Sequence, residues 1–162
     1  PVFIPLGSLL TKTAKEIDGL EGVTLAAADG VLSPDFLEAA GDAAEGMYMS
    51  GPDLSFGNEI YDEFLVTYEE TYGTEPLSVF HAHAFDATNM LLNAIENVAQ
   101  IDGDGNVLIG RQALIDEIAS TSGLAGITGT ISCNATGDCA DPQIAVNQVV
   151  DGAFDSVWAF EE

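Results

Sequence analysis

Basic residues are nearly absent from this sequence. Lys12, Lys15 and Arg111 stand against 27 acidic residues, which gives a formal net charge of −24 at pH 7. Nucleic-acid binding requires a basic surface that neutralises phosphates, and three scattered cations cannot form one. The same shortage disfavours an anionic membrane surface. We therefore expect neither nucleic acid nor an acidic lipid surface as a partner.

Long hydrophobic runs are also missing. No stretch of about 18 apolar residues is present, so the sequence predicts no membrane-spanning helix. Residues 1–5 are apolar, but no basic segment precedes them, so we do not expect them to form a signal peptide. We expect either that a leader was removed or that the chain begins inside a longer protein.

Cysteine is scarce, and Cys133 and Cys139 are the two present. The residues between them include Gly137 and short polar side chains, which favour the tight reversal of a small disulfide loop. A metal site would need further Cys or His nearby in the sequence. The pattern therefore favours a disulfide, and with it an oxidising compartment outside the cytoplasm, over two free thiols or a metal site.

Apolar residues, in contrast, are plentiful. They make up 47% of the 162 residues, enough for one domain of ordinary size with a real hydrophobic core. This content argues against intrinsic disorder despite the charge. We interpret the acidic residues as a solvated surface suited to a salty or acidic medium, with binding of counter-ions or metals as the alternative.

The first 52 residues alternate between strand-like and helix-like patterns. Short apolar or β-branched runs predict buried strands at residues 2–4, 23–28 and 47–50. Helical spacing predicts one helix from Gly7 to Gly19 and a second from Ser33 to Glu45, with Ser33 as its cap. Such alternation is typical of an α/β fold in which helices cover a parallel sheet.

The remaining residues combine further helices with later strands. Apolar spacing predicts helices over residues 58–72, 79–100 and 111–120, with a polar turn over residues 102–106. Alternating or β-branched runs predict strands at residues 126–132, 144–150 and 156–160. No internal repeat, low-complexity tract or flexible linker interrupts these elements.

Motifs for metal binding are incomplete. Asp102, Asp104 and Asn106 imitate the start of a calcium loop, but Ala113 occupies the position of its bidentate carboxylate. We interpret this segment as a hydrophilic turn. His81 and His83 are two positions apart, on different faces of a helix, and are poor metal ligands. We expect no metal and no cofactor.

The sequence also contains no recognisable catalytic motif. The nucleophile elbow Gly-x-Ser-x-Gly and the dinucleotide fingerprint Gly-x-Gly-x-x-Gly do not occur. A hydrolase with a Ser–His–Asp triad stays an alternative, because the sequence contains many Ser and Asp residues. We nevertheless expect that the protein is not an enzyme, and we assign no catalytic residue. Asn134-Ala135-Thr136 fits an N-glycosylation sequon, a pattern too short to be specific.

Asp29 follows a predicted buried strand. Open α/β sheets bind ligands at the carboxyl ends of their strands. The carboxylate of Asp29 could pair there with the ammonium group of a ligand. The alternative is that Asp29-Gly30 forms only a turn.

Several short motifs, taken in order, resemble one protein family. They are Asp29-Gly30, Ser33-Pro34-Asp35-Phe36, residues 41–48, Phe64-x3-Tyr68-x3-Tyr72-Gly73, Phe85-Asp86-Ala87, Gly126-Ile127-Thr128-Gly129, Gly137-Asp138-Cys139 and Val146-x-Gln148-Val149-x-Asp151-Gly152. The set resembles the C-terminal portion of type I periplasmic or extracellular solute-binding proteins of ABC transporters for branched-chain amino acids (leucine, isoleucine, valine) and amides. It covers nearly all of the chain.

The resemblance implies a two-lobed clamshell with α/β/α layers and a ligand cleft between the lobes. Residues 1–52 would belong to the second lobe, residues 53–125 would be helices packed largely on the first, and residues 126–162 would be C-terminal strands, with helices and strands crossing between lobes. In that family a carboxylate matching Asp29 meets the α-ammonium of the ligand, and aromatic residues matching Phe3 and Phe80 border its side chain. Phe3 replaces a common Tyr, and Asp29 stands where some members carry Glu.

The function implied by the resemblance is extracytoplasmic capture of a small amino acid or amide, with delivery to the permease of an ABC transporter. A sensor or a cell-surface structural module with the same fold is the alternative. The expected location is periplasmic or extracellular, and a lipid anchor at a missing N-terminus is one means of attachment. The missing N-terminal half of the protein, or a second copy of the chain, is expected to cover the apolar faces that this portion leaves open.

Overall fold

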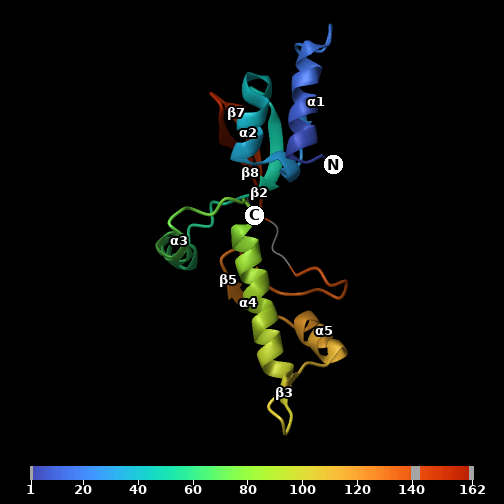
Figure 1. Cartoon of the computed structure of the whole chain (residues 1–162), viewed down its shortest axis with the longest axis vertical. Coiled ribbons are helices and arrows are strands. Elements are labelled where there is room, and N and C mark those ends of the chain that lie inside the picture. Colours follow the sequence, from blue (N-terminus) through green and yellow to red (C-terminus); the bar gives the residue numbers. More distant parts are fainter. Residues whose placement is uncertain (1, 140–142, 161–162) are drawn as a thin grey trace. The chain divides into compact units, whose positions relative to one another are not determined.

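The computed structural model describes residues 2–139 and 143–160, and Figure 1 shows the elements they form. The chain divides into two compact units that are interleaved in sequence. Unit 1 contains residues 1–55, 77–79 and 143–162, and unit 2 contains residues 56–76 and 80–142. The strands expected over residues 126–162 are therefore divided between the two units.

Unit 1 is built on a mixed sheet with the strand order β1-β2-β7-β8. Its strands are β1 (Ala26–Ala27), β2 (Tyr48–Pro52), β7 (Ile144–Val150) and β8 (Ala153–Ala159). β1 and β2 run parallel, whereas β7 is antiparallel to both of its neighbours. Asp151 at φ 52° and Gly152 at φ 75° form the tight turn between β7 and β8.

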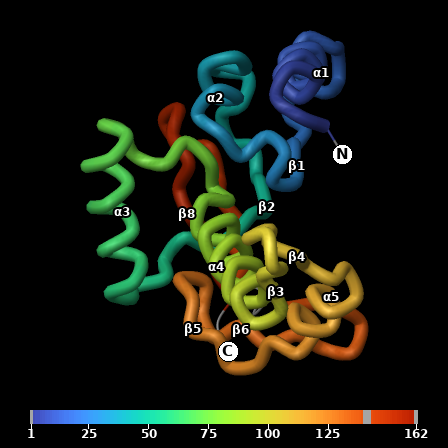
Figure 2. The backbone as a smooth tube through the Cα atoms, turned by 60° about the horizontal axis from the view of Figure 1, so that its bottom comes forward, coloured from blue at the N-terminus to red at the C-terminus, as the bar shows by residue number. Residues whose placement is uncertain are grey.

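Two helices of unit 1, α1 (Ile4–Glu16) and α2 (Pro34–Ala40), lie side by side (Figures 1 and 2). The Ser33 side chain caps α2 by accepting a hydrogen bond from the Asp35 N–H at 3.2 Å, as predicted. A short 3₁₀ turn, η1 (Asp29–Val31), follows β1, and a second, η2 (Gly41–Ala44), follows α2. The core of the unit is formed by the buried side chains of Val31, Leu32, Phe36, Ala40, Ala44, Met47, Met49 and Val149.

Three local predictions in unit 1 are wrong. The expected strand at residues 2–4 does not form: Phe3 is the N-cap of α1 and Ile4 its first residue, and Pro5 lies in the first helical turn, where its missing N–H costs nothing. The expected strand at residues 23–28 is limited to Ala26–Ala27, and Val23 is 44% exposed. The second helix ends at Ala40 because Gly41 takes φ 58°, a conformation that glycine tolerates.

The helices of unit 2 agree with the sequence pattern. They are α3 (Glu59–Tyr72), α4 (His81–Val98) and α5 (Arg111–Ala119). Asn58 caps α3 by accepting from the Tyr61 N–H at 3.0 Å, and Gly73 ends it in the left-handed conformation at φ 71°. α5 lies beside α4, and the Asn97 side chain donates to Glu117 Oε1 at 2.7 Å (Figure 2).

Two short hairpins complete unit 2. Strands β3 (Gln100–Ile101) and β4 (Val107–Leu108) flank the predicted polar turn. Strands β5 (Leu124–Gly126) and β6 (Gly129–Ile131) replace the single strand predicted over residues 126–132. That prediction is wrong because the chain reverses at Ile127-Thr128, and Gly129 permits the reversal with a φ of 116°.

Candidate ligand-binding site

Phe3 lies against Gly30, the residue that follows Asp29, near the end of β1 in unit 1. A Cβ atom at Gly30 would lie 3.3 Å from Phe3 Cδ1 and 2.6 Å from the Val2 carbonyl oxygen. Asp29 Cβ lies 3.9 Å from the position of a Cβ at Gly51, a buried residue of β2. Asp29 therefore stands where the parallel strands β1 and β2 reach their carboxyl ends. Glycine is required at position 30, because a Cβ there would meet the Val2 backbone oxygen.

The carboxylate of Asp29 is open to solvent. The residue is exposed, and no hydrogen bond from another described residue reaches its side-chain oxygens. Its backbone carbonyl accepts from the Leu32 N–H at 2.9 Å, which fixes the η1 turn and the direction in which the chain leaves β1. Phe3, which lies against the following residue Gly30, is 70% exposed. An exposed carboxylate and an exposed aromatic ring on the same short segment can present a charge and an apolar wall to a small molecule.

Phe80 lies in unit 2. It precedes the first residue of α4 and is 42% exposed. The aromatic side chains near the start of α4 form a cluster with those of α3, including Phe64 and Phe85 with ring centroids 5.1 Å apart. Between the two helices lies an open groove of about 880 Å³, lined in part by Phe64, Tyr68, Tyr72, His81 and Phe85. This groove was not predicted from the sequence, although the Phe64-x3-Tyr68-x3-Tyr72 spacing places these rings on one helix face.

Asp86 is a buried carboxylate with a structural role. It is 4% exposed, and its oxygens accept from the Ile127 N–H at 2.9 Å and from the Thr128 N–H and hydroxyl at 2.8 and 2.7 Å. A Cβ at Gly126 would lie 2.6 Å from Asp86 Cγ, so glycine is required there by close approach. The hydrogen bonds of Asp86 thus connect the β5–β6 turn to α4.

The sequence matches a model of the periplasmic binding protein family over residues 6–153. The chain belongs to this family. Proteins of this family bind solutes. A comparison with curated proteins found no match to this sequence. This periplasmic binding protein has the type I fold, because solved structures of that fold superimpose on nearly all of it.

Three solved structures illustrate the similarity. A leucine-binding protein from Thermotoga maritima is 26% identical with a TM-score of 0.75, over 98% of this chain and 42% of its own. An extracellular ligand-binding receptor from Rhodopseudomonas palustris HaA2 is 24% identical with a TM-score of 0.68, over 96% and 46%. An ABC transporter substrate-binding protein from Desulfitobacterium hafniense, in complex with Leu, is 20% identical with a TM-score of 0.64, over 93% and 40%. This chain spans less than half the length of each.

The two histidines of this periplasmic binding protein contact aromatic rings. His81 Nε2 shares a hydrogen bond of 2.8 Å with the Tyr61 hydroxyl, and burial raises the pKa of Tyr61 with help from the charge of Glu75. The ring of His83 lies 6.3 Å from that of Phe56. Burial lowers the pKa of His83, the charge of Asp86 opposes this shift, and His83 Nδ1 is buried without a hydrogen-bond partner among the described residues.

The predicted calcium-like segment is a closed polar turn. Asp102 Oδ1 accepts from the Asp104 and Asn106 N–H groups at 2.9 Å, and Oδ2 accepts from the Asn106 side chain at 2.9 Å. The Asn106 side chain and backbone hold the pKa of Asp102 below its ordinary value. No group of three or more His, Cys, Asp or Glu residues in the described part of the chain could hold a metal ion.

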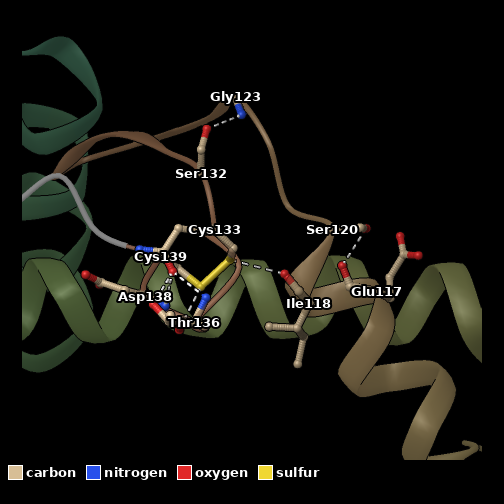
Figure 3. The surroundings of a disulfide bond; sticks show 11 residues. Glu117, Ile118, Ser120, Gly123, Ser132, Cys133, Thr136, Asp138 and Cys139 are labelled. Carbon is tan, nitrogen blue, oxygen red and sulfur yellow. Dashed lines mark hydrogen bonds between the residues drawn. A yellow bond between two sulfur atoms is a disulfide. The ribbon is translucent and has the colours of Figure 1, made fainter.

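The cysteines form the disulfide favoured by the sequence, between Cys133 and Cys139 (Figure 3). The bond closes a small loop after β6. The Cys133 N–H donates to the Thr121 carbonyl at 2.9 Å, and the Gly123 N–H donates to the Ser132 hydroxyl at 2.9 Å, which ties the loop to the segment after α5. Among the described residues, none of the helices has the length and apolar content needed to cross a membrane.

Proposed function

We propose that this protein captures a small amino acid, with a branched-chain amino acid as the first candidate, outside the cytoplasm and delivers it to an ABC transporter. The observation that carries the proposal is the exposed carboxylate of Asp29 at the carboxyl end of β1, with the exposed ring of Phe3 against the next residue, Gly30. The leucine-binding protein similar to 98% of this chain supports the ligand class. The disulfide supports an oxidising location.

In this proposal each residue has a separate task. Asp29 accepts hydrogen bonds from the ligand ammonium, and closure of the protein around the ligand strengthens this pair by removing water. Phe3 contacts the apolar side chain of the ligand and contributes affinity through buried area. Phe80 is the second aromatic residue that the family resemblance assigns to this task. The ligand favours the closed state only through the extra contacts that it makes there. The closed state is the form that a permease would recognise.

The experiment is calorimetric titration of the intact protein with leucine, isoleucine, valine and small amides. We expect saturable binding of at least one of them, and we expect Asp29→Ala to weaken it by about 2–5 kcal/mol, as for a lost charge partner. Asp18→Ala is the matched control, because it removes an equally exposed carboxylate from the same unit and should leave affinity unchanged. Equal affinity of Asp29→Ala and the unaltered protein would remove Asp29 from the site, and absence of heat with every ligand would remove the function.

Exposed apolar side chains support a second part of the proposal. Leu77 in unit 1 is 81% exposed and Ile101 in unit 2 is 75% exposed. Surfaces of this kind usually contact further protein. We infer that additional residues of the same protein, corresponding to the part of the T. maritima structure that this chain does not match, cover these side chains.

This inference is tested with the 162-residue chain alone. We expect it to bind an apolar dye or to self-associate, and we expect a longer version of the protein to do neither. A monodisperse, stably folded monomer of the chain alone that binds no dye would contradict the inference.

A further inference from the structure

The sequence contains a single Asn-x-Ser/Thr sequon, Asn134-Ala135-Thr136. In the structure it lies inside the loop that the Cys133–Cys139 disulfide closes. Asn134, Ala135 and Thr136 are all exposed. The middle residue is alanine and Gly137 follows the sequon, so no proline constrains either position.

The backbone holds the sequon in a tight reversal. The Gly137 N–H donates to the Asn134 carbonyl at 3.1 Å, and the Asn134 N–H donates to the Asp138 carbonyl at 2.8 Å. Gly137 takes φ 85°, which glycine allows without strain. Thr136 and Asp138 lie beside the disulfide (Figure 3). The disulfide and the turn hydrogen bonds together hold the backbone of the loop that presents Asn134 at the surface.

The side chains of the sequon are arranged for reaction at nitrogen. Asn134 Oδ1 accepts from the Thr136 hydroxyl at 2.7 Å, from the Thr136 N–H at 2.9 Å and from the Asp138 N–H at 3.1 Å. Three donors on one carbonyl oxygen draw electron density from the amide, which makes an Nδ2 proton easier to remove. No hydrogen bond within the described residues uses Nδ2. The oxygen is therefore occupied while the nitrogen stays open to solvent.

We propose that Asn134 is a site of N-linked glycosylation. The donor is a sugar attached through its anomeric carbon to a phosphate group, carried on a lipid. In the transfer the bond between the anomeric carbon and the phosphate oxygen breaks, and its electron pair leaves with the phosphate. The Nδ2–carbon bond forms, and Nδ2 gives up one proton, which the departing phosphate accepts. The proposal goes beyond amino-acid binding and shares with it only the extracytoplasmic location.

The same contacts also give Asn134 a structural role, because its oxygen caps the turn. Asn134→Asp separates the two roles. The aspartate retains an oxygen that can accept all three hydrogen bonds, so the loop should keep its structure, but it lacks the nitrogen that would carry a sugar. Thr136→Ser keeps the hydroxyl donor, whereas Thr136→Ala removes it.

The test is mass spectrometry of the peptide that contains residues 134–136, from protein purified from its own cells. We expect a glycan mass on Asn134, retained in Thr136→Ser and lost in Asn134→Asp and Thr136→Ala. Asn93→Gln is the control, because Asn93 is exposed and also precedes alanine but lacks a hydroxyl residue two positions later, so the glycan should remain. An unmodified peptide from the unaltered protein, or a glycan that persists in Asn134→Asp, would overturn the proposal. Neither result bears on the titrations with amino acids.

Discussion

Asp86 holds a turn that lies 41 positions further along the chain. We predict that Asp86→Ala lowers the free energy of unfolding by about 3 kcal/mol, because the Ile127 and Thr128 N–H groups lose a carboxylate acceptor where water has little access to replace it. Asp86→Asn should cost less, since one acceptor oxygen remains. Glu96→Ala, at an exposed position of the same helix, is the control and should change stability by less than about 0.5 kcal/mol. Denaturant unfolding of the intact protein measures all three.

His83 gives unit 2 a predicted dependence on pH. Its pKa in the folded state is lowered from 6.5, mainly by burial, so the unfolded chain binds the proton more readily. The stability contributed by neutral His83 is therefore complete above about pH 6.5 and is lost as the pH falls through the lowered folded-state pKa. Asp86 and His81 are the charged or titratable neighbours that act on it, in opposite directions.

The measurement is the unfolding midpoint between about pH 7.5 and 5.5, above the range in which most carboxylates titrate. We expect the midpoint of the unaltered protein to fall with pH, and that of His83→Asn to fall less. Parallel curves for the two proteins would show that His83 does not titrate in this window.

At the scale of elements, Asn58 joins the start of α3 to the β5–β6 hairpin. Its Oδ1 caps the helix at Tyr61 N, and its Nδ2 donates to the Ile127 carbonyl at 2.9 Å. We predict that Asn58→Ala destabilises the protein by about 1–2 kcal/mol, because a cap and a bond between elements are lost together. Asn58→Asp should recover the cap but not the bond to Ile127. Thermal unfolding would contradict this assignment if the Asp variant were no more stable than the Ala variant.

Elements whose signals are local could be predicted from the sequence. Ser33, Asn58 and Gly73 act on the helix that each one starts or stops, so the pattern around them was sufficient. The strand expected at residues 2–4 and the single strand expected at residues 126–132 were wrong. Short apolar runs fit a strand or a helix start equally well, and contacts elsewhere in the fold decide between them.

The candidate site was predictable to a similar extent. Asp29 could be found because it follows a strand-like run and precedes a glycine, and the structure places it at the end of β1. The approach of Phe3 to the neighbouring Gly30 depends on where α1 begins, and the sequence pattern did not show that α1 begins at Ile4. The role of Asp86 was missed because its partners are distant in sequence and a lone aspartate in a helix has no local signature.

At the scale of the whole molecule, the net charge of −24 sets a dependence on salt. Like charges repel in the folded state, and the Debye length falls from about 10 Å at 0.1 M salt to about 3 Å at 1 M. We predict that raising NaCl from about 0.05 M to 1 M increases the melting temperature by about 2–4 °C, which corresponds to roughly 1 kcal/mol for a chain of this size. A variant that carries amides at the exposed positions Glu38, Glu70 and Asp155 should show a smaller increase. A melting temperature that is independent of salt would contradict the prediction.

The pairing of β2 with β7 has a consequence for biosynthesis. Pro52 pairs with Ile144 and Tyr48 with Gln148, so a ribosome makes one strand long before its neighbour. Until residues 144–150 leave the exit tunnel, one side of β2 offers unpaired backbone groups to any other extended chain. Truncated translation products that stop before residue 144 should therefore be the species most dependent on chaperones and most prone to aggregate.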